Sequence, residues 1–106
     1  VHSDYAIAVN SGTSALVVGL AASGVKPGDE VIVPSFTFAA TANAVAFLGA
    51  SPVFADIDPD TYAITPETIL PLVSERTKGI MPVHLFGHPA PLPELIDFAS
   101  EKGLEL

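Results

Sequence analysis

Apolar residues along this chain gather in two kinds of segment, which alternate with each other. Short runs rich in β-branched residues are typical of strands, and the longer alanine-, leucine- and valine-rich segments between them are typical of helices. We expect strands at residues 5–9, 29–34, 52–57, 78–83 and 104–106, and helices at residues 13–23, 37–48, 65–74 and 93–102. This order predicts an α/β fold with a mainly parallel sheet and helices packed on both of its faces.

Several helix boundaries carry the residue types that such boundaries prefer. Thr65 followed by Pro66 is typical of a helix start, and Gly103 is typical of a helix end. Either Ser35 or Thr37 is available to cap the helix that we expect from residue 37.

Three segments with polar residues follow expected strands, namely residues 10–14, 34–38 and 83–88. In an open parallel sheet, ligands bind beyond the carboxyl ends of the strands. We therefore expect the three segments to converge on one rim.

The first segment, Asn10 to Ser14, lies between a strand and a helix start. Backbone N–H groups at a helix start have no intrahelical partner, and the helix dipole favours an anion there. Gly12 lets a ligand approach the backbone, and Thr13 and Ser14 add hydroxyl donors, so a phosphate is the natural ligand. Ser, Thr and Asn are also the preferred capping residues, so an ordinary N-cap is the alternative interpretation.

The second segment carries two aromatic residues, Phe36 and Phe38. Most aromatic side chains pack in a core. The functional alternative is that one ring stacks on a flat aromatic ligand, and Phe38, at the start of the expected helix, is placed to do so.

The third segment carries His84 and His88. A metal site needs a third ligand, and these histidines lie on a loop with Gly87 and Pro89, not on one helix face. A general base also needs a nearby partner, which the sequence does not show. We therefore expect no metal site, and we expect His84 to order the loop by a hydrogen bond.

The acidic run Asp56-Ile57-Asp58-Pro59-Asp60 is similar to a Mg²⁺ or Ca²⁺ ligand set but lacks the spacing of a calcium loop with its distal Glu. We expect a turn at residues 58–61 that ends the strand and exposes its carboxylates, because Asp and Pro favour turns.

Composition narrows the class of protein. With 106 residues the chain forms one domain at most. Its net charge of -8 argues against nucleic acid and against anionic membranes as partners. The chain has no cysteine, which excludes disulfides and thiolate chemistry. It shows neither a signal peptide nor an apolar run of membrane-spanning length, so we expect a cytoplasmic protein.

Five motifs together carry a resemblance to a known family. In order they are Ser11-Gly12-Thr13-Ser14-Ala15-Leu16, the run from Pro27 to Phe38, Ala40-Thr41-Ala42-Asn43-Ala44, the run from Pro52 to Asp58, and Pro82-Val83-His84-Leu85-Phe86-Gly87. The set resembles the DegT/DnrJ/EryC1/StrS family of sugar aminotransferases that depend on pyridoxal 5'-phosphate. The resemblance covers nearly the whole chain, and it implies part of the large domain of a fold type I aminotransferase.

The resemblance also implies roles for single residues. Gly12 and Thr13 would bind the cofactor phosphate, with Ser14 close by, and Phe38 would stack on the pyridine ring. Asn43 and His84 match positions of the family to which we assign no role. The implied substrates are a nucleotide-linked keto-sugar and an amino acid, glutamate, as amine donor. The implied assembly of the intact protein is a homodimer.

A pyridoxal enzyme of this kind needs a lysine to hold the cofactor covalently and an acid beside the ring nitrogen. Lys26, Lys78 and Lys102 lie in or beside expected turns, and none matches the family's catalytic position. We therefore expect residues 1–106 to be a fragment of the cofactor-binding large domain, without a second domain, without catalytic residues and inactive alone.

Three alternatives stay open on the sequence. Some relatives carry histidine in place of the catalytic lysine and dehydrate the sugar. A non-catalytic module that binds phosphate or a nucleotide is the second alternative. The third is a structural fragment without ligand affinity, with exposed sheet edges that favour association.

Overall fold

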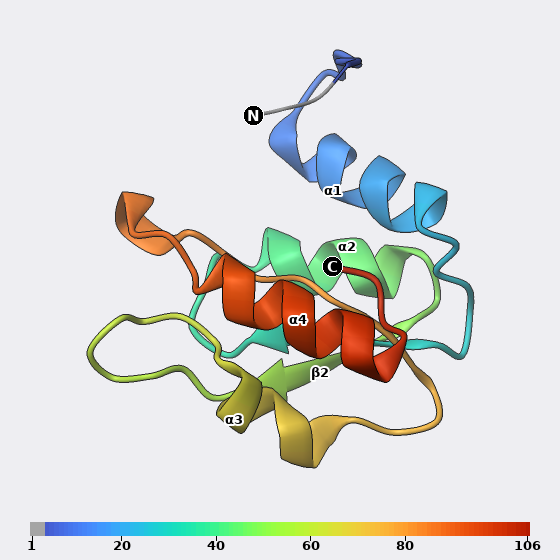
Figure 1. The fold of residues 1–106 in the computed structure, drawn as a ribbon. Coiled ribbons are helices and arrows are strands. Elements are labelled where there is room, and N and C mark those ends of the chain that lie inside the picture. Colours follow the sequence, from blue (N-terminus) through green and yellow to red (C-terminus); the bar gives the residue numbers. More distant parts are fainter. Residues whose placement is uncertain (1–3) are drawn as a thin grey trace.

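The computed structural model describes residues 4–106. Its helices and strands alternate as expected for an α/β fold (Figure 1). In chain order they are α1 (Gly12–Ala22), β1 (Glu30–Pro34), α2 (Ala40–Phe47), β2 (Ser51–Ala55), α3 (Pro66–Ile69), the 3-10 helix η1 (Leu70–Leu72), β3 (Thr77–Ile80), the 3-10 helix η2 (Leu85–Gly87) and α4 (Leu92–Lys102). Within this range no helix is long and apolar enough to cross a membrane.

The described residues contain a parallel three-stranded sheet in the order β2-β1-β3. Residues 30–34 of β1 pair in register with residues 51–55 of β2, and Ile32 pairs with Ile80 of β3 on the other side. The predicted parallel sheet is therefore confirmed. Of the strand expected at residues 104–106, Glu105 alone joins the sheet, by a single bridge to Gly79.

Different helices cover the two faces of β1. Ile32 packs in a cluster with residues of α3 and α4, including Leu95. Val31 and Val33 pack in a second cluster with Val45 of α2. Successive side chains of a strand point to opposite faces, so helices on both faces explain why the sequence of β1 is a continuous apolar run.

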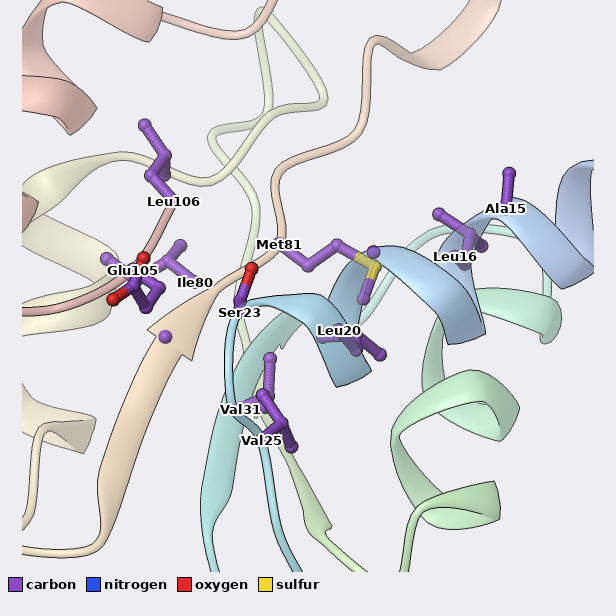
Figure 2. A pocket seen from close by; sticks show the side chains of 12 residues that line it. Ala15, Leu16, Leu20, Ser23, Val25, Val31, Ile80, Met81, Glu105 and Leu106 are labelled. Carbon is purple, nitrogen blue, oxygen red and sulfur yellow. The ribbon is translucent and has the colours of Figure 1, made fainter. Parts of the chain in front are cut away.

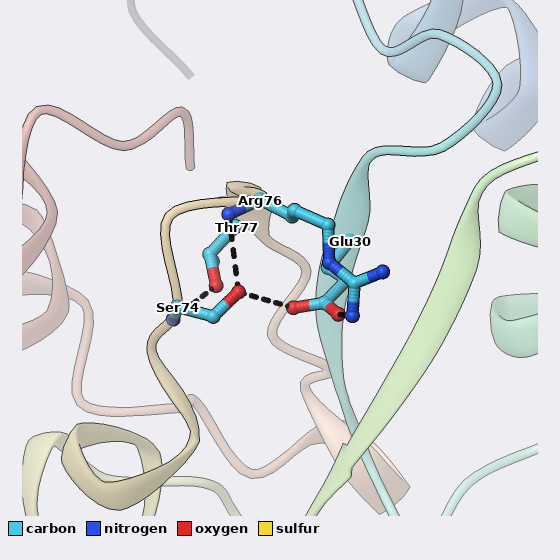
Figure 3. Close-up of polar contacts among 4 residues, drawn as sticks. All are labelled: Glu30, Ser74, Arg76 and Thr77. Carbon is cyan, nitrogen blue, oxygen red and sulfur yellow. Dashed lines mark hydrogen bonds and ion pairs between the residues drawn. The ribbon is translucent and has the colours of Figure 1, made fainter.

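A polar network ties the sheet together at the amino ends of β1 and β3 (Figure 3). Glu30 is buried, and its carboxylate accepts a hydrogen bond from the Ser74 hydroxyl at 2.6 Å and pairs with the Arg76 guanidinium. The Thr77 hydroxyl accepts a hydrogen bond from the Ser74 N–H at 2.8 Å. These contacts satisfy a buried carboxylate at the end of the sheet opposite to the predicted rim, so they belong to the fold.

The prediction of a strand at residues 5–9 is wrong. This segment is neither helix nor strand and lies outside the sheet, and Ile7 is 86% exposed. An apolar run becomes a strand only by pairing with a neighbour, and a pattern along one segment cannot show whether a neighbour is in reach.

Two expected helices differ from the observed ones. The helix expected from residue 37 begins at Ala40 with Ala39 at the N-cap, and in the described chain neither Ser35 nor Thr37 caps it. The helix expected at residues 65–74 changes to a 3-10 turn after Ile69. The reason is Pro71, which has no N–H to donate and whose ring clashes with the preceding turn.

Other boundary predictions are confirmed. Thr65 caps α3 in a reciprocal capping box with Thr68, with Pro66 in the first turn. Gly103 ends α4 in the left-handed conformation at φ 67°. Both signals depend on neighbouring residues alone, which is why the sequence suffices to show them.

Candidate functional site

One cavity collects residues from all three segments of the predicted rim. It has a volume of about 470 Å³. Its lining residues are Gly12, Thr13, Leu16, Thr37, Phe38, Ala40, Thr41 and Val83. In Figure 1 α1 lies along α2 and both helices begin on the same side, which brings the first turns of both to this cavity. Three of the four residues predicted to bind a cofactor, Gly12, Thr13 and Phe38, therefore lie together.

The start of α1 has a cap and also free backbone donors. Ser11 is the N-cap residue, and its hydroxyl oxygen accepts a hydrogen bond from the Ser14 N–H at 3.1 Å. The Ser14 hydroxyl also contacts the Ser11 hydroxyl at 3.0 Å. Within residues 4–106 no group accepts a hydrogen bond from the N–H of Gly12 or Thr13. The cap thus uses one helix-start donor and leaves two unpaired donors beside the cavity.

The surroundings of Gly12 leave room for a ligand. A Cβ atom built on Gly12 meets no described atom within 4 Å. Protein packing does not explain the missing side chain, and the space beside the two free N–H groups is open. Open space, unpaired donors and the positive end of a helix dipole together suit an oxyanion such as phosphate.

The two aromatic residues after β1 have different surroundings. The Phe36 ring packs against the Tyr62 ring, with 5.9 Å between the centroids, and is 48% exposed. Phe38 lines the cavity and is 79% exposed. Within the described part of the chain Phe38 is therefore not a core residue, and its ring is accessible.

Two threonines add hydroxyl groups to the cavity. Thr37 and Thr41 both line it, and their hydroxyl oxygens lie 3.4 Å apart. The sequence pattern does not single them out. A usable signal is their spacing of four residues, which brings two side chains together on a helical turn.

The third rim segment contributes Val83 to the cavity, and neither His84 nor His88 lines it. The Nδ1 atom of His84 accepts a hydrogen bond from the Ala90 N–H at 3.0 Å across the loop. The prediction that His84 orders this loop is confirmed. In the part of the chain that is described, no three His, Cys, Asp or Glu side chains form a group that could hold a metal ion.

The acidic run forms the predicted turn. One carboxylate oxygen of Asp58 accepts hydrogen bonds from the backbone N–H groups of Asp60 and Thr61 and from the Thr61 hydroxyl. The Thr61 backbone N–H, then its hydroxyl and the Asp60 N–H, lower the pKa of Asp58. Asp58 therefore organises the connection after β2.

The lysines lie elsewhere. Lys78 forms an ion pair with Glu105 at 3.7 Å, and Lys102 forms one with Glu101 at 3.1 Å. Lys26 lies in the turn before β1, where its N–H donates to Asp29. Neither these lysines nor Asn43, which is exposed on α2, line the cavity.

A second cavity, of about 240 Å³, lies between α1, the end of β3 and the C-terminal residues (Figure 2). Aliphatic side chains dominate its lining, and Met81 extends toward α1 there. Among the described residues that line it, Glu105 alone is charged. An apolar cavity with one carboxylate does not suit an anion, so the cavity at the starts of α1 and α2 is the candidate site.

Comparisons with known proteins give a consistent result. The model of the DegT/DnrJ/EryC1/StrS aminotransferase family matches residues 1–106. The UDP-N-acetyl-3-dehydro-alpha-D-glucosamine 3-aminotransferase of Acidithiobacillus ferrooxidans is 51% identical over 96 residues, which are 91% of this chain and 26% of that protein. The 3-oxo-glucose-6-phosphate:glutamate aminotransferase of Bacillus subtilis is 42% identical over 105 residues, which are 99% of this chain and 24% of that protein.

A solved structure supports the same fold. NtdA from Bacillus subtilis with the bound cofactor PMP matches with a TM-score of 0.94 and 43% identity, over 97% of this chain and 24% of that one. The chain spans about a quarter of the length of the relatives it matches. The α/β fold is thus that of one part of an aminotransferase.

Proposed function

The chain belongs to the DegT/DnrJ/EryC1/StrS aminotransferase family, and from this premise we propose that it forms the phosphate- and ring-binding part of a pyridoxal 5'-phosphate site. Members of the family are aminotransferases that depend on this cofactor. We propose that the reaction moves an amino group from glutamate to a nucleotide-linked keto-sugar. Because the chain spans about a quarter of its relatives, the activity is that of a longer protein.

One observation carries the proposal. Gly12 and Thr13, whose N–H groups are unpaired among the described residues, line the same cavity as the exposed residue Phe38. An anion site and a flat apolar surface in one cavity match the two ends of pyridoxal phosphate, a phosphate and an aromatic ring.

Each residue has a separate task in binding. The N–H groups of Gly12 and Thr13 and the Thr13 hydroxyl donate to the phosphate, aided by the helix dipole. Phe38 covers one face of the ring and fixes its plane. Ser14 lies beside the phosphate and holds the helix start through Ser11. When bound, the cofactor supplies the electron sink for amine transfer, and the protein supplies binding and orientation.

The apolar surface of α1 supports the placement of this chain within a larger domain. Only Thr13 and Ser14 of its eleven residues are polar, yet none of the eleven is buried. A helix that is apolar on all sides is typical of a buried position. We propose that further parts of the large domain, including the lysine and the acid that the chemistry needs, pack around it.

The activities of the relatives support the proposed substrates. The Acidithiobacillus relative is an aminotransferase of a UDP-linked sugar, and the name of the Bacillus relative includes glutamate. Both are aminotransferases, which favours amine transfer over the dehydration that some family members perform. We further propose a homodimer, which sedimentation of the full-length protein tests.

The phosphate site is tested by a matched pair of variants in the full-length protein. Gly12→Val fills the open space beside the two N–H groups. It should weaken binding of pyridoxal phosphate and of inorganic phosphate by about tenfold, since hydrogen bonds to a charged group are lost. Gly19→Val is the control, because it lies on the same helix and also has open space around it.

The function itself is tested by following amine transfer from glutamate to a UDP-linked 3-keto-sugar. Transfer that needs added pyridoxal phosphate supports the proposal. Loss of water from the sugar without amine transfer identifies the dehydratase alternative. Binding of phosphate without binding of pyridoxal phosphate identifies the non-catalytic module. Equal affinities of the Gly12→Val and Gly19→Val variants would show that the phosphate lies elsewhere.

A further inference from the structure

The Phe38 ring needs a support that packing does not supply. Its side chain is 79% exposed, so few protein atoms hold it at the cavity wall. The backbone φ and ψ angles fix the Cα–Cβ bond about which the ring turns, so they limit the region that the ring can reach. The contacts that hold the turn at residues 37–38 therefore limit where the ring can lie.

Thr41 makes two contacts with this turn. Its backbone N–H donates to the Phe38 carbonyl oxygen at 3.1 Å. Its hydroxyl lies 3.4 Å from the hydroxyl of Thr37. Thr41 itself is only 5% exposed, so it is a fixed point from which the turn is held.

The start of α2 makes these contacts more important. Ala39 occupies the N-cap position, and in residues 4–106 no side chain caps this helix. A helix start without a cap leaves its first turn weakly held. The pair formed by Thr37 and Thr41 is the polar side-chain contact that joins the turn to the helix.

The hydrogen bond between the two hydroxyls can run in either direction. Two hydroxyls share one hydrogen bond, so one of them keeps a free proton. A free donor is costly at buried Thr41 and tolerable at half-buried Thr37. The arrangement with Thr41 as donor therefore has the lower cost, and it would leave the free proton on Thr37, which also lines the cavity.

We propose that Thr41 is a positioning residue of the cofactor cavity, which acts through Thr37 to hold the turn that presents the Phe38 ring. This inference rests on the proposed function, because it takes the ring of pyridoxal phosphate as the group that Phe38 covers. Thr41 itself has no contact with the ligand in this proposal.

Thr41→Val tests the inference in the full-length protein, because it removes the hydroxyl and keeps the branched shape. Its affinity for pyridoxal phosphate should fall by about two- to fivefold, the effect of one modest hydrogen bond. Its affinity for inorganic phosphate should stay unchanged, because the N–H groups of α1 are untouched. The visible circular dichroism of the bound cofactor should change, since it depends on ring orientation, and Thr41→Ser should restore it.

Two further variants separate positioning from stability. Thr77→Val removes a buried threonine hydroxyl at the opposite end of the sheet and should alter neither affinity. Thr37→Val should reproduce the effect of Thr41→Val, and the double variant should add nothing, because both changes break one contact. If Thr41→Val does not fold, Thr37→Val still tests the inference. Thr37 is half-buried, so this change should perturb folding less.

The possible outcomes distinguish the two proposals. If Phe38→Ala weakens cofactor binding while Thr41→Val and Thr37→Val bind as the wild type does, the inference is overturned and the proposed function stands. If Phe38→Ala also binds as the wild type does, the ring site of the proposed function is wrong. If Thr77→Val loses as much affinity for pyridoxal phosphate as Thr41→Val, the loss reflects lower stability of the whole protein. The inference then fails.

Discussion

The Ser11 hydroxyl oxygen accepts its hydrogen bond from the Ser14 N–H at 3.1 Å, and it leaves the N–H groups of Gly12 and Thr13 unpaired. Capping and anion binding are usually alternative explanations of a Ser- and Thr-rich helix start. Here they use different donors of the same turn. The cap holds the first turn of α1, whose residues Gly12 and Thr13 line the cavity.

Ser11→Ala removes the cap and should lower the free energy of unfolding by about 1 kcal/mol, the usual effect of a lost N-cap. Ser11→Gly is the matched control and should lose only a few tenths of a kcal/mol, because glycine is tolerated at this position. Urea unfolding of the full-length protein measures both. An equal loss in the two variants would mean that the Ser11 hydroxyl does not stabilise α1.

Phe38→Ala should weaken cofactor binding, whereas Phe36→Ala should lower stability. Phe38 is exposed, so its loss should change stability by less than about 0.5 kcal/mol and weaken pyridoxal phosphate binding by about three- to tenfold. Phe36 packs on Tyr62, so its loss should cost about 1 kcal/mol of stability and leave cofactor affinity unchanged.

Absorbance titration and urea unfolding of these two variants measure both quantities. The reverse pattern, with Phe36 needed for binding and Phe38 for stability, would exchange the roles of the two rings.

Of the two partners of Glu30, Ser74 should contribute more to the free energy of unfolding than Arg76. The Arg76 side chain is 72% exposed, so water screens its attraction, and Arg76→Ala should cost less than about 1 kcal/mol. Ser74→Ala removes the hydroxyl donor to one oxygen of a buried carboxylate, whereas Arg76 pairs with the other oxygen, and should cost about 1 to 3 kcal/mol.

Unfolding at low and high salt separates the two contributions, because screening weakens only the ion pair. A larger loss of stability in Arg76→Ala than in Ser74→Ala would contradict this order. Neither variant should alter cofactor affinity, since the network lies at the opposite end of the sheet.

Asp58 should make stability depend on pH at the acid end. Its pKa is lowered, so folding favours the ionised carboxylate. The resulting stabilisation is present above the ordinary aspartate pKa of about 3.9 and is lost as the pH falls through the lowered value. Asp58→Asn should flatten this part of the profile, although Glu67, whose pKa is also lowered, should keep some of it.

The free energy of unfolding as a function of pH measures this effect. Thr61→Val is a second check, because it removes one of the donors to Asp58 and should raise its pKa toward the ordinary value, as observed by the ¹³C shift of the carboxyl carbon. An Asp58 pKa that stays the same in this variant would assign the shift to the backbone donors alone.

Local signals in the sequence were sufficient for much of the fold. The order of apolar runs predicted the α/β architecture and its parallel sheet, and Thr65 and Gly103 marked helix ends correctly. These features depend on residues within one turn or one strand of each other. The rim segments also contained Gly12, Thr13 and Phe38, although their ligand remains a prediction.

The set of elements, their parallel arrangement and the residue types at one rim therefore follow from the sequence alone. The three-dimensional fold was needed to show that residues 5–9 lie outside the sheet, that Phe36 packs on Tyr62 while Phe38 is exposed, and that the hydroxyls of Thr37 and Thr41 are in contact. The physical reason is that pairing and packing depend on neighbours distant in sequence. A residue's type limits what it can contact, and the fold decides what comes within reach.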